Sequence, residues 1–330
     1  MKKTLLTLLA ASAFVSNMLA IEANTVEIVY SGTTATVTVA SNISSYVTVS
    51  SGTSSHVKLV LAADFAGVDA TVDNEDGEII YVLSGSSADG EFYMEGAYKA
   101  TVELNGLTLT NPSGPAINIQ NGKRIELSAK KGTVSTISDG ANDTYNGCYH
   151  CKGHTKLKGK GTLNVAGNSK HAIYSKEYIE VKNLTLNITS AVKDAMHCKE
   201  YFLMESGTVN ISGSCDDGIQ VELDGLTSTG TTTEHEDEDS GNFYMTGGTL
   251  TISGYQGKAV KADGTISYSG GTRNFDTTDT ETYAGIDGIA TDDATDAATY
   301  DLSGRRIATA RKGGIYILKG NGRAVKTIIK

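Results

Sequence analysis

Thr162-Leu163-Asn164-Val165 recurs as Thr185-Leu186-Asn187-Ile188 and again as Thr208-Val209-Asn210-Ile211, so one short pattern returns with a period of about 23 residues. A fourth copy, Thr249-Leu250-Thr251-Ile252, follows after one period plus an insertion of about 18 residues. A fixed period of this length indicates a solenoid, in which each repeat stacks on its neighbours. Polar and apolar residues alternate within each copy, as in a β-strand. The pattern therefore predicts an all-β fold, a right-handed parallel β-helix with about 23 residues per coil.

Two further strands per coil keep the same register. Ala172-Ile173, Ala195-Met196 and Gly218-Ile219 are again one period apart, and a third set of apolar pairs includes Ile179/Val181 and Phe202/Met204. Because neighbouring strands lie about 4.8 Å apart, equivalent side chains should stack along the axis. Two buried ladders are expected, one of Leu163, Leu186, Val209 and Leu250 and one of Val165, Ile188, Ile211 and Ile252. The Thr and Asn columns between them are expected to face water.

The rest of the chain up to residue 275 has the same character. The 330 residues include 37 Gly, only 2 Pro and no Trp, and Thr, Val and Ile, which favour strands, are abundant. Strand-like segments reach upstream to Val26–Val29, and no stretch after residue 20 keeps a helical period. One elongated β-helix domain over residues 21–275 is therefore expected.

The segment 1–20 is expected to be a signal peptide. Met1-Lys2-Lys3 is positively charged, Thr4–Val15 is apolar, and small residues precede a cut near Ala20. A buried N-terminal helix is the alternative. No later apolar run has transmembrane length. The mature chain is therefore expected to be secreted or attached to the cell surface.

The C-terminal part is expected to hold an acidic linker over 276–298 and a small β domain over 299–330. The linker region contains acidic residues and no basic one. The order of Tyr300–Ile307, Gly313–Leu318 and Val325–Lys330 resembles the C-terminal sorting domain of type IX secretion cargo. That resemblance implies the outer-membrane secretion machinery as a partner. The alternative is a β domain that only closes the solenoid.

Four cysteines, Cys148, Cys151, Cys198 and Cys215, are present in a chain expected to be exported, where disulfides are common. Cys151 and Cys198 occupy the same slot two coils apart, roughly 9–10 Å, whereas a disulfide needs Cα atoms within about 7 Å. We therefore expect both to be buried without a disulfide. A local Cys148–Cys151 loop stays open as an alternative, and a zinc–thiolate site is disfavoured.

Acidic residues mark two candidate calcium sites. Asp194 and Asp217 share one slot of successive coils, with Asp216 beside them. Stacked carboxylates repel each other unless a cation lies between them, and Ca²⁺ takes carboxylate oxygens. The insertion contains Glu234-His235-Glu236-Asp237-Glu238-Asp239, from which Glu236, Asp237 and Asp239 are further candidate ligands. The alternative is a solvated acidic loop.

Basic residues are concentrated in one part of an acidic chain. The net charge is −10, yet the segment 123–199 contains twelve Lys and one Arg against six acidic residues. Lys152, Lys176 and Lys199 fall in one outward column. A basic strip of this kind can hold an anionic polymer. For an exported protein an acidic polysaccharide is a better partner than nucleic acid, which we do not expect.

Aromatic residues follow the same strip. Tyr178 and Tyr201 are predicted to stack in one exposed outward column, with Tyr174 nearby in the column of His150 and His197. Exposed rings on a flat sheet can contact the apolar face of a sugar. They can equally serve only cross-strand packing.

Residues 78–274 resemble a bacterial family of carbohydrate-binding β-helix proteins, with a fold similar to that of pectate lyases. The segments that carry the resemblance are Val102–Leu107, Ala172–Lys176, Ser190–Met196, Ser214–Ile219, His235–Asn242 and Gly247–Ile252. The resemblance implies binding of cellulose or acidic sugars and bound Ca²⁺. One departure is Lys258, with Lys261 after it, where an acidic residue is common, and this puts an ion between the last two coils in doubt.

Sequence favours a non-catalytic binder over an enzyme. A β-helix lyase needs Ca²⁺ and a strong base such as Arg or Lys, and the solenoid has only Arg124 and Arg273, at opposite ends of the regular coils. A glycosidase needs two carboxylates about 5–9.5 Å apart, which almost any pair of corner residues satisfies. The expected function is binding of an acidic plant-type polysaccharide such as the pectin component polygalacturonate. The alternatives are a calcium-dependent lyase and a surface adhesin without a glycan ligand.

Overall fold

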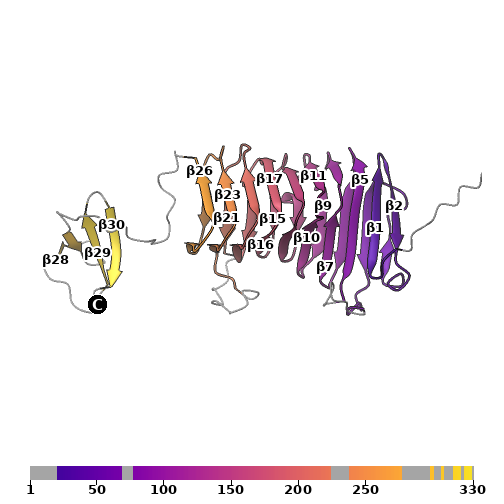
Figure 1. Ribbon diagram of the computed structural model, residues 1–330, viewed down its shortest axis with the longest axis horizontal. Helices are drawn as coiled ribbons and strands as arrows, with labels where there is room; N and C mark the ends of the chain where they lie inside the picture. The colour runs from indigo at the N-terminus through magenta and orange to yellow at the C-terminus, as the bar shows by residue number, and fades with distance from the viewer. Residues whose placement is uncertain are drawn as a thin grey trace, which may run out of the picture.

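The computed structural model describes residues 21–68, 77–223 and 238–276, together with strand residues 298–300, 306–307, 315–320 and 323–328. All regular secondary structure in these ranges is β-strand, without any α-helix, in agreement with the all-β prediction. Strands β1 to β26 follow one another along an elongated body (Figure 1). None of the described residues forms a helix long and apolar enough to cross a membrane.

One of the two long sheets has nine strands. Its strands pair in parallel, except that β3 and β4 are antiparallel at one edge. In sheet order the strands are β3 (Val47–Val49), β4 (His56–Leu61), β6 (Glu91–Gly96), β9 (Ile117–Asn121), β12 (Gly147–Cys151), β15 (His171–Ser175), β18 (Met196–Lys199), β21 (Ile219–Glu222) and β24 (Val260–Ala262).

The other long sheet has 17 strands and consists of two parallel ladders. The first contains β5 (Ile79–Ser87), β7 (Ala100–Leu104), β10 (Ile125–Ala129), β13 (Thr155–Gly159), β16 (Ile179–Lys182), β19 (Tyr201–Met204), β22 (Asn242–Met245) and β25 (Ile266–Tyr268). The second contains β8 (Thr108–Asn111), β11 (Val134–Asp139), β14 (Thr162–Ala166), β17 (Thr185–Ser190), β20 (Thr208–Ile211), β23 (Thr249–Ile252) and β26 (Thr272–Phe275). Strand β5 pairs with both β7 and β8 and so joins the ladders. The hairpin of β1 (Thr25–Ser31) and β2 (Thr34–Val39) adds to β5.

From β12 to β26 the chain visits the three ladders in a fixed order, one strand in each. This order is compatible with the three sides of a β-helix coil, as the repeat predicts; the handedness of the turn stays a prediction. The insertion falls between β21 and β22, as expected. Residues 224–237 lie outside the described ranges.

The register confirms the predicted core. Leu163, Leu186, Val209 and Leu250 are direct partners on β14, β17, β20 and β23, and each is at most 1% exposed. Burying one such side chain contributes about 1.5–3 kcal/mol, so stability accumulates coil by coil.

The polar columns between the core ladders are half-buried rather than open to water. The Asn187 side-chain amide donates to Asn164, and that of Asn210 donates to Asn187, both at 2.9 Å. Because parallel strands place identical side chains one spacing apart, each amide finds its partner on the next coil. The column therefore adds hydrogen bonds between coils.

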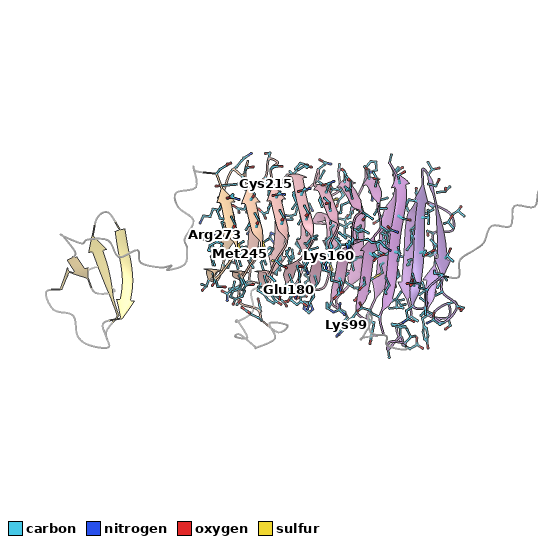
Figure 2. All side chains as sticks on the ribbon, in the orientation of Figure 1. Lys99, Lys160, Glu180, Cys215, Met245 and Arg273 are labelled. Atoms are coloured by element: carbon cyan, nitrogen blue, oxygen red, sulfur yellow. The ribbon has the colours of Figure 1, made fainter. Side chains whose placement is uncertain are left out.

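The four cysteines are free and buried. Cys151, Ser175 and Cys198 are register partners on β12, β15 and β18, which confirms the predicted shared slot. Cys215 lies at a corner near the top edge of the body as drawn in Figure 2 and is 2% exposed.

The C-terminal strands form a separate antiparallel sheet. It contains β27 (Ala298–Tyr300), β28 (Arg306–Ile307), β29 (Ile315–Gly320) and β30 (Arg323–Ile328). A role in sorting stays a prediction for this region. The expected signal peptide, residues 1–20, and residues 277–297 of the expected linker lie outside the described residues.

Candidate functional site

The outer face of the nine-stranded sheet carries a column of rings. His150, Tyr174 and His197 are register partners on β12, β15 and β18. The ring of Tyr174 stacks on His150 at 5.2 Å and on His197 at 5.5 Å between centroids. Tyr174 therefore lies in the predicted histidine column. Because each ring covers its neighbour, Tyr174 presents only 8% of its surface to solvent.

Two of the three predicted lysines lie free beside this column. Lys152 and Lys176 directly follow the register partners of β12 and β15 and are exposed. Neither forms an ion pair with a described residue. By contrast, Lys156 and Lys182 on the other sheet pair with glutamates at 3.1 and 2.6 Å. Lys199 continues the column but is half-buried.

A shallow open groove of about 500 Å³ lies on the same face. It is lined by β4, β6 and β9 and the end of β12, through Val60, Leu61, Ala63, Tyr93, Glu95, Gly96, Ala97, Gln120 and Lys152. The Tyr93 hydroxyl donates to Glu95 at 2.6 Å, and the Lys58 ammonium lies 4.6 Å from the centre of the Tyr93 ring. The groove thus combines a half-buried ring with a lysine from the predicted column. Sequence reasoning missed Tyr93 because the early coils do not keep the regular period.

The predicted exposure of Tyr178 and Tyr201 is wrong. Their rings do stack, at 4.8 Å between centroids, but both side chains are 0% exposed. His154 stacks on the other side of Tyr178 at 4.4 Å, and the Tyr201 hydroxyl donates to Glu180 at 2.8 Å. Together with Leu203 the two tyrosines form a small apolar cluster outside the main core. The column therefore serves packing, the alternative noted from the sequence.

The structure brings the predicted aspartates of the first calcium corner together. Asp194, Asp216 and Asp217 place carboxylate oxygens within 4.8 Å of one another. The two buried carboxylates already have partners, however. Asp217 pairs with the Lys261 ammonium at 3.1 Å and accepts the Lys258 N–H at 2.7 Å. Lys258, at the position in doubt, thus contributes its backbone N–H, and the positive charge comes from Lys261. This charge reduces the need for a metal ion here.

A second acidic corner combines a predicted residue with three that sequence reasoning missed. Glu177, Glu200 and His154 place ligand atoms within 4.8 Å of one another. The end of the insertion reaches this corner, since the Gly241 N–H donates to the Glu200 carbonyl at 2.6 Å. Asp239 is 7% exposed, and neither of its carboxylate oxygens has a hydrogen-bond partner among the described residues. Glu177 and Glu200 stand one period apart in the sequence, so the repeat could have revealed the pair.

The ionisation of Glu200 reflects this crowding. Burial, followed by the hydrogen bond and charge of Glu177 and the charge of Asp239, raises the pKa of Glu200 to about 9. Its carboxyl group is therefore protonated at neutral pH when no cation is bound. A divalent cation among these oxygens would remove the repulsion and displace the proton. Glu236 and Asp237, the other predicted ligands, lie outside the described residues.

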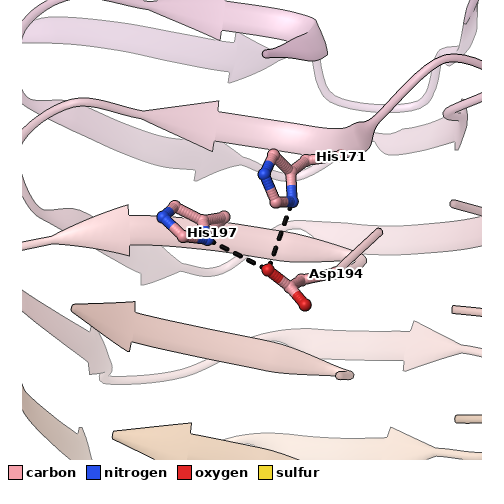
Figure 3. Close-up of side chains that lie close together, drawn as sticks. All are labelled: His171, Asp194 and His197. Atoms are coloured by element: carbon pink, nitrogen blue, oxygen red, sulfur yellow. Dashed lines mark hydrogen bonds and ion pairs between the residues drawn. The ribbon is translucent and has the colours of Figure 1, made fainter. Parts of the chain in front are cut away.

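A third cluster includes His197, the last ring of the column. His171 and His197 direct their Nδ1 atoms at the same oxygen of Asp194, Oδ2, from 3.3 and 3.0 Å (Figure 3). All three side chains are buried. Burial, reinforced by the neighbouring His197, lowers the pKa of His171 to about 3, so its imidazole is neutral at physiological pH.

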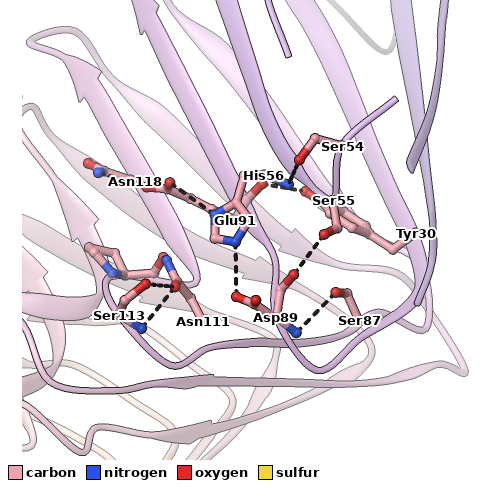
Figure 4. A network of polar contacts seen from close by, with 11 residues as sticks. Tyr30, Ser54, Ser55, His56, Ser87, Asp89, Glu91, Asn111, Ser113 and Asn118 are labelled. Atoms are coloured by element: carbon pink, nitrogen blue, oxygen red, sulfur yellow. Dashed lines mark hydrogen bonds and ion pairs between the residues drawn. The ribbon is translucent and has the colours of Figure 1, made fainter. Parts of the chain in front are cut away.

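Polar groups near the N-terminal edge of the nine-stranded sheet satisfy one another (Figure 4). His56 Nε2 lies 3.0 Å from Asp89 Oδ1, and the Asn118 amide donates to Glu91 at 3.0 Å. The Ser55 hydroxyl donates to the Asp89 carbonyl at 2.7 Å. We assign this network a structural role, joining β4, β6 and β9.

Comparisons with known proteins agree with this architecture. A family model described as carbohydrate-binding domain-containing protein matches residues 66–321. Among solved structures, the chain is similar to one described as the polysaccharide lyase-like protein from C. thermocellum, in a gadolinium derivative. The two are 18% identical with a TM-score of 0.51, over 76% of this chain and 94% of the other. At this identity the match supports the fold alone. No curated protein matches the chain.

Proposed function

The chain belongs to the family of carbohydrate-binding domain-containing proteins, and we propose that it binds an acidic polysaccharide such as polygalacturonate without cleaving it. The binding surface in this proposal is the outer face of the nine-stranded sheet. The polymer lies along the body and crosses successive strands, so that equivalent side chains of successive coils meet successive sugars.

The observation that carries this proposal is the pair of free cations beside the groove. Lys152 lines the groove, and Lys176 follows one strand further along, both exposed and without an ion pair to a described residue. A cation already paired with a carboxylate has less to gain from a second anion. The two free ammonium groups, about one strand spacing apart, therefore suit the carboxylates of a uronic-acid polymer. Lys199, which is half-buried, extends the column with a smaller contribution.

Contacts with the neutral part of a sugar come from Tyr93 in this proposal. Its half-buried ring lines the groove, whereas Tyr178 and Tyr201 are covered. Tyr174, which is 8% exposed, contributes little. Polar groups at the groove, such as Glu95 and Gln120, can exchange hydrogen bonds with sugar hydroxyls.

The environment of the two solenoid arginines supports binding without cleavage. Arg124 is buried, forms an ion pair with Glu78, and lies 2.9 Å from Glu126. The guanidinium of Arg273 lies 3.9 Å from the centre of the Tyr268 ring. A lyase that uses arginine as its base needs that group to face the substrate, and neither arginine is among the residues that line the groove. Lys152 does line the groove, so the product assay described below tests for a lysine base. The alternative is a calcium-dependent polysaccharide lyase. The similar solved structure is described as polysaccharide lyase-like.

We further propose that Ca²⁺ stabilises the protein at the corner of Glu177, Glu200 and Asp239. Calcium takes several carboxylate and carbonyl oxygens, and the unpartnered oxygens of Asp239 fit such an ion. The corner of Asp194, Asp216 and Asp217 fits less well because Lys261 and backbone N–H groups occupy its buried oxygens. The bound ion would hold the end of the insertion against the coils.

Export to the outside of the cell completes the proposal. The signal-peptide pattern of residues 1–20 and the sorting-domain resemblance of residues 299–330 support a secreted or cell-surface protein. Detection of the mature N-terminus after Ala20 in the culture medium or at the cell surface checks both. A chain that retains residues 1–20 in the cytoplasm would contradict them.

Replacing Lys152 and Lys176 together by Ala is expected to weaken polygalacturonate binding about 3–10-fold at low salt, since each exposed charge pair contributes about 0.2–1 kcal/mol. The loss should shrink at physiological ionic strength because salt screens exposed charges. Isothermal titration calorimetry at two salt concentrations measures both effects. A Lys130→Ala and Lys182→Ala double variant, which removes two ion-paired lysines of the other sheet, is the matched control and should bind like the parent.

Two outcomes count against the proposal. Equal losses in the two double variants would show that only net charge matters and that the face is wrong. Release of unsaturated oligosaccharides, followed by ultraviolet absorbance with Ca²⁺ present, would establish a lyase instead of a binder.

A further inference from the structure

The cluster of His171, Asp194 and His197 has the donor set of a transition-metal site. His171 opens β15, His197 lies on β18, and Asp194 precedes β18, so two adjacent strands hold all three (Figure 3). Their ligand atoms lie within 4.8 Å of one another. Two imidazoles and one carboxylate suit zinc and related divalent ions, whereas calcium prefers oxygen ligands alone.

One of the two measured distances equals the edge of a metal coordination shell, and the other is slightly shorter. Zinc lies about 2.0–2.2 Å from nitrogen and oxygen ligands. Two ligands at the tetrahedral angle are then about 3.3–3.6 Å apart. Asp194 Oδ2 lies 3.3 Å from His171 Nδ1 and 3.0 Å from His197 Nδ1. An ion could therefore enter among the three atoms with small movements of the side chains.

One atom of the cluster is left without a hydrogen bond. The Nδ1 of His171 has no hydrogen-bond partner among the described residues, although the side chain is only 6% exposed. A buried polar atom that makes no hydrogen bond of good geometry is uncommon in native proteins, and an absent ion is one physical explanation. The atom faces the Asp194 carboxylate, where such an ion would sit.

Outer contacts also match those of a metal site. Histidine ligands usually direct their second ring nitrogen at a carboxylate or carbonyl group, which fixes the ring. His197 Nε2 lies 3.5 Å from Glu222 Oε2. The other oxygen of Asp194 accepts the Asp217 N–H at 3.2 Å, which orients the carboxylate. A hydrogen bond between His197 and Asp194 alone would explain one of these contacts but not the approach of His171.

We propose that His171, Asp194 and His197 bind one divalent transition-metal ion, with Zn²⁺ as the ion of choice. Three protein ligands leave the fourth position of a tetrahedral ion for water or a ligand group. The site is distinct from the calcium corner of Glu177, Glu200 and Asp239 and does not depend on glycan binding. It joins two adjacent coils beside the ring column.

Titration of the metal-stripped full chain with Zn²⁺ tests the proposal. One tight Zn²⁺ ion per chain is expected, not displaced by millimolar Ca²⁺. His171→Ala and His197→Ala should each weaken zinc binding by more than about 100-fold, and Glu222→Gln by about 10–100-fold. His150→Ala is the matched control, because His150 lies in the same ring column but its Nδ1 already accepts the Asn146 N–H; this variant should bind zinc like the parent.

A second measurement guards against variants that fail to fold. Co²⁺ bound to the parent should give the intense visible absorption of a tetrahedral site with nitrogen and oxygen ligands. Absence of stoichiometric Zn²⁺ binding by the parent would overturn the proposal, and so would equal binding by folded His171→Ala. Zinc binding should persist in Asp239→Asn, which separates this site from the calcium proposal.

Discussion

Leu186→Asp is expected to abolish the cooperative folding of the β-body. Leu186 is 0% exposed and lies between its register partners Leu163 and Val209 in the core. A buried charge without a partner costs several kcal/mol even after relaxation, which is comparable with a total stability of about 5–15 kcal/mol. In a solenoid each coil depends on its neighbours, so a break in the middle removes support on both sides.

Thermal and urea melts followed by circular dichroism measure this effect. Thr189→Asp is the matched control, because Thr189 lies on the same strand β17 with its side chain exposed. The control loses the 3.3 Å hydrogen bond from the Thr189 hydroxyl to the Val165 carbonyl, so we expect it to differ from the parent by no more than about 1.5 kcal/mol. If Leu186→Asp melts like the parent, the assignment of Leu186 to the core is wrong.

The core was predictable because its signal repeats. The alternation of polar and apolar residues in each copy of the four-residue pattern indicates which side chains point inward. Parallel pairing of equivalent residues then places Leu163 next to Leu186. The shared slot of Cys151 and Cys198 followed from the same register. The ion pair between Lys261 and Asp217 was not predicted; Lys258 and Lys261 only raised doubt about an ion between the last two coils.

The solvent exposure of outward-facing side chains was harder to predict. The register shows on which side of the strand a side chain lies, but it does not show which neighbouring side chains cover it. Tyr178 and Tyr201 stack as expected, yet His154 and the neighbouring side chains bury them. The link between Glu200 and Asp239 was not predictable in the same way. Asp239 follows an insertion with no repeat to set its position, so only the folded chain brings it to Glu200.

The raised pKa of Glu200 has a consequence for stability. Glu200 keeps its proton up to about pH 9 in the folded chain, whereas an unfolded glutamate loses it near its ordinary value of about 4.3. Between these values the unfolded state binds fewer protons, so without calcium the stability contributed by this group falls as pH rises. Glu200→Gln should therefore be more stable than the parent at pH 8 and show a weaker dependence on pH.

With calcium bound, the parent should instead be more stable than Glu200→Gln. At a concentration 100 times the dissociation constant, Ca²⁺ should stabilise the parent by about 2.7 kcal/mol, or about 5–10 °C in Tm. Glu200→Gln and Asp239→Asn should lose most of that shift, because each removes a charged ligand. Calcium binding at pH 7 should also release a proton from the parent and none from Glu200→Gln. Calorimetry in two buffers of different ionisation enthalpy measures this release.

Glu205→Gln is the matched control for the calcium site, because Glu205 flanks β19 at the end opposite to Glu200 and pairs with Lys182 at the surface. It should keep the full calcium shift. If Glu200→Gln keeps it as well, the ion lies elsewhere, and Asp217→Ala then decides whether the corner of Asp194 and Asp216 holds it. Loss of the shift in Asp217→Ala alone would restore the site predicted from the repeat and leave Glu200 to keep its proton without a metal ion beside it.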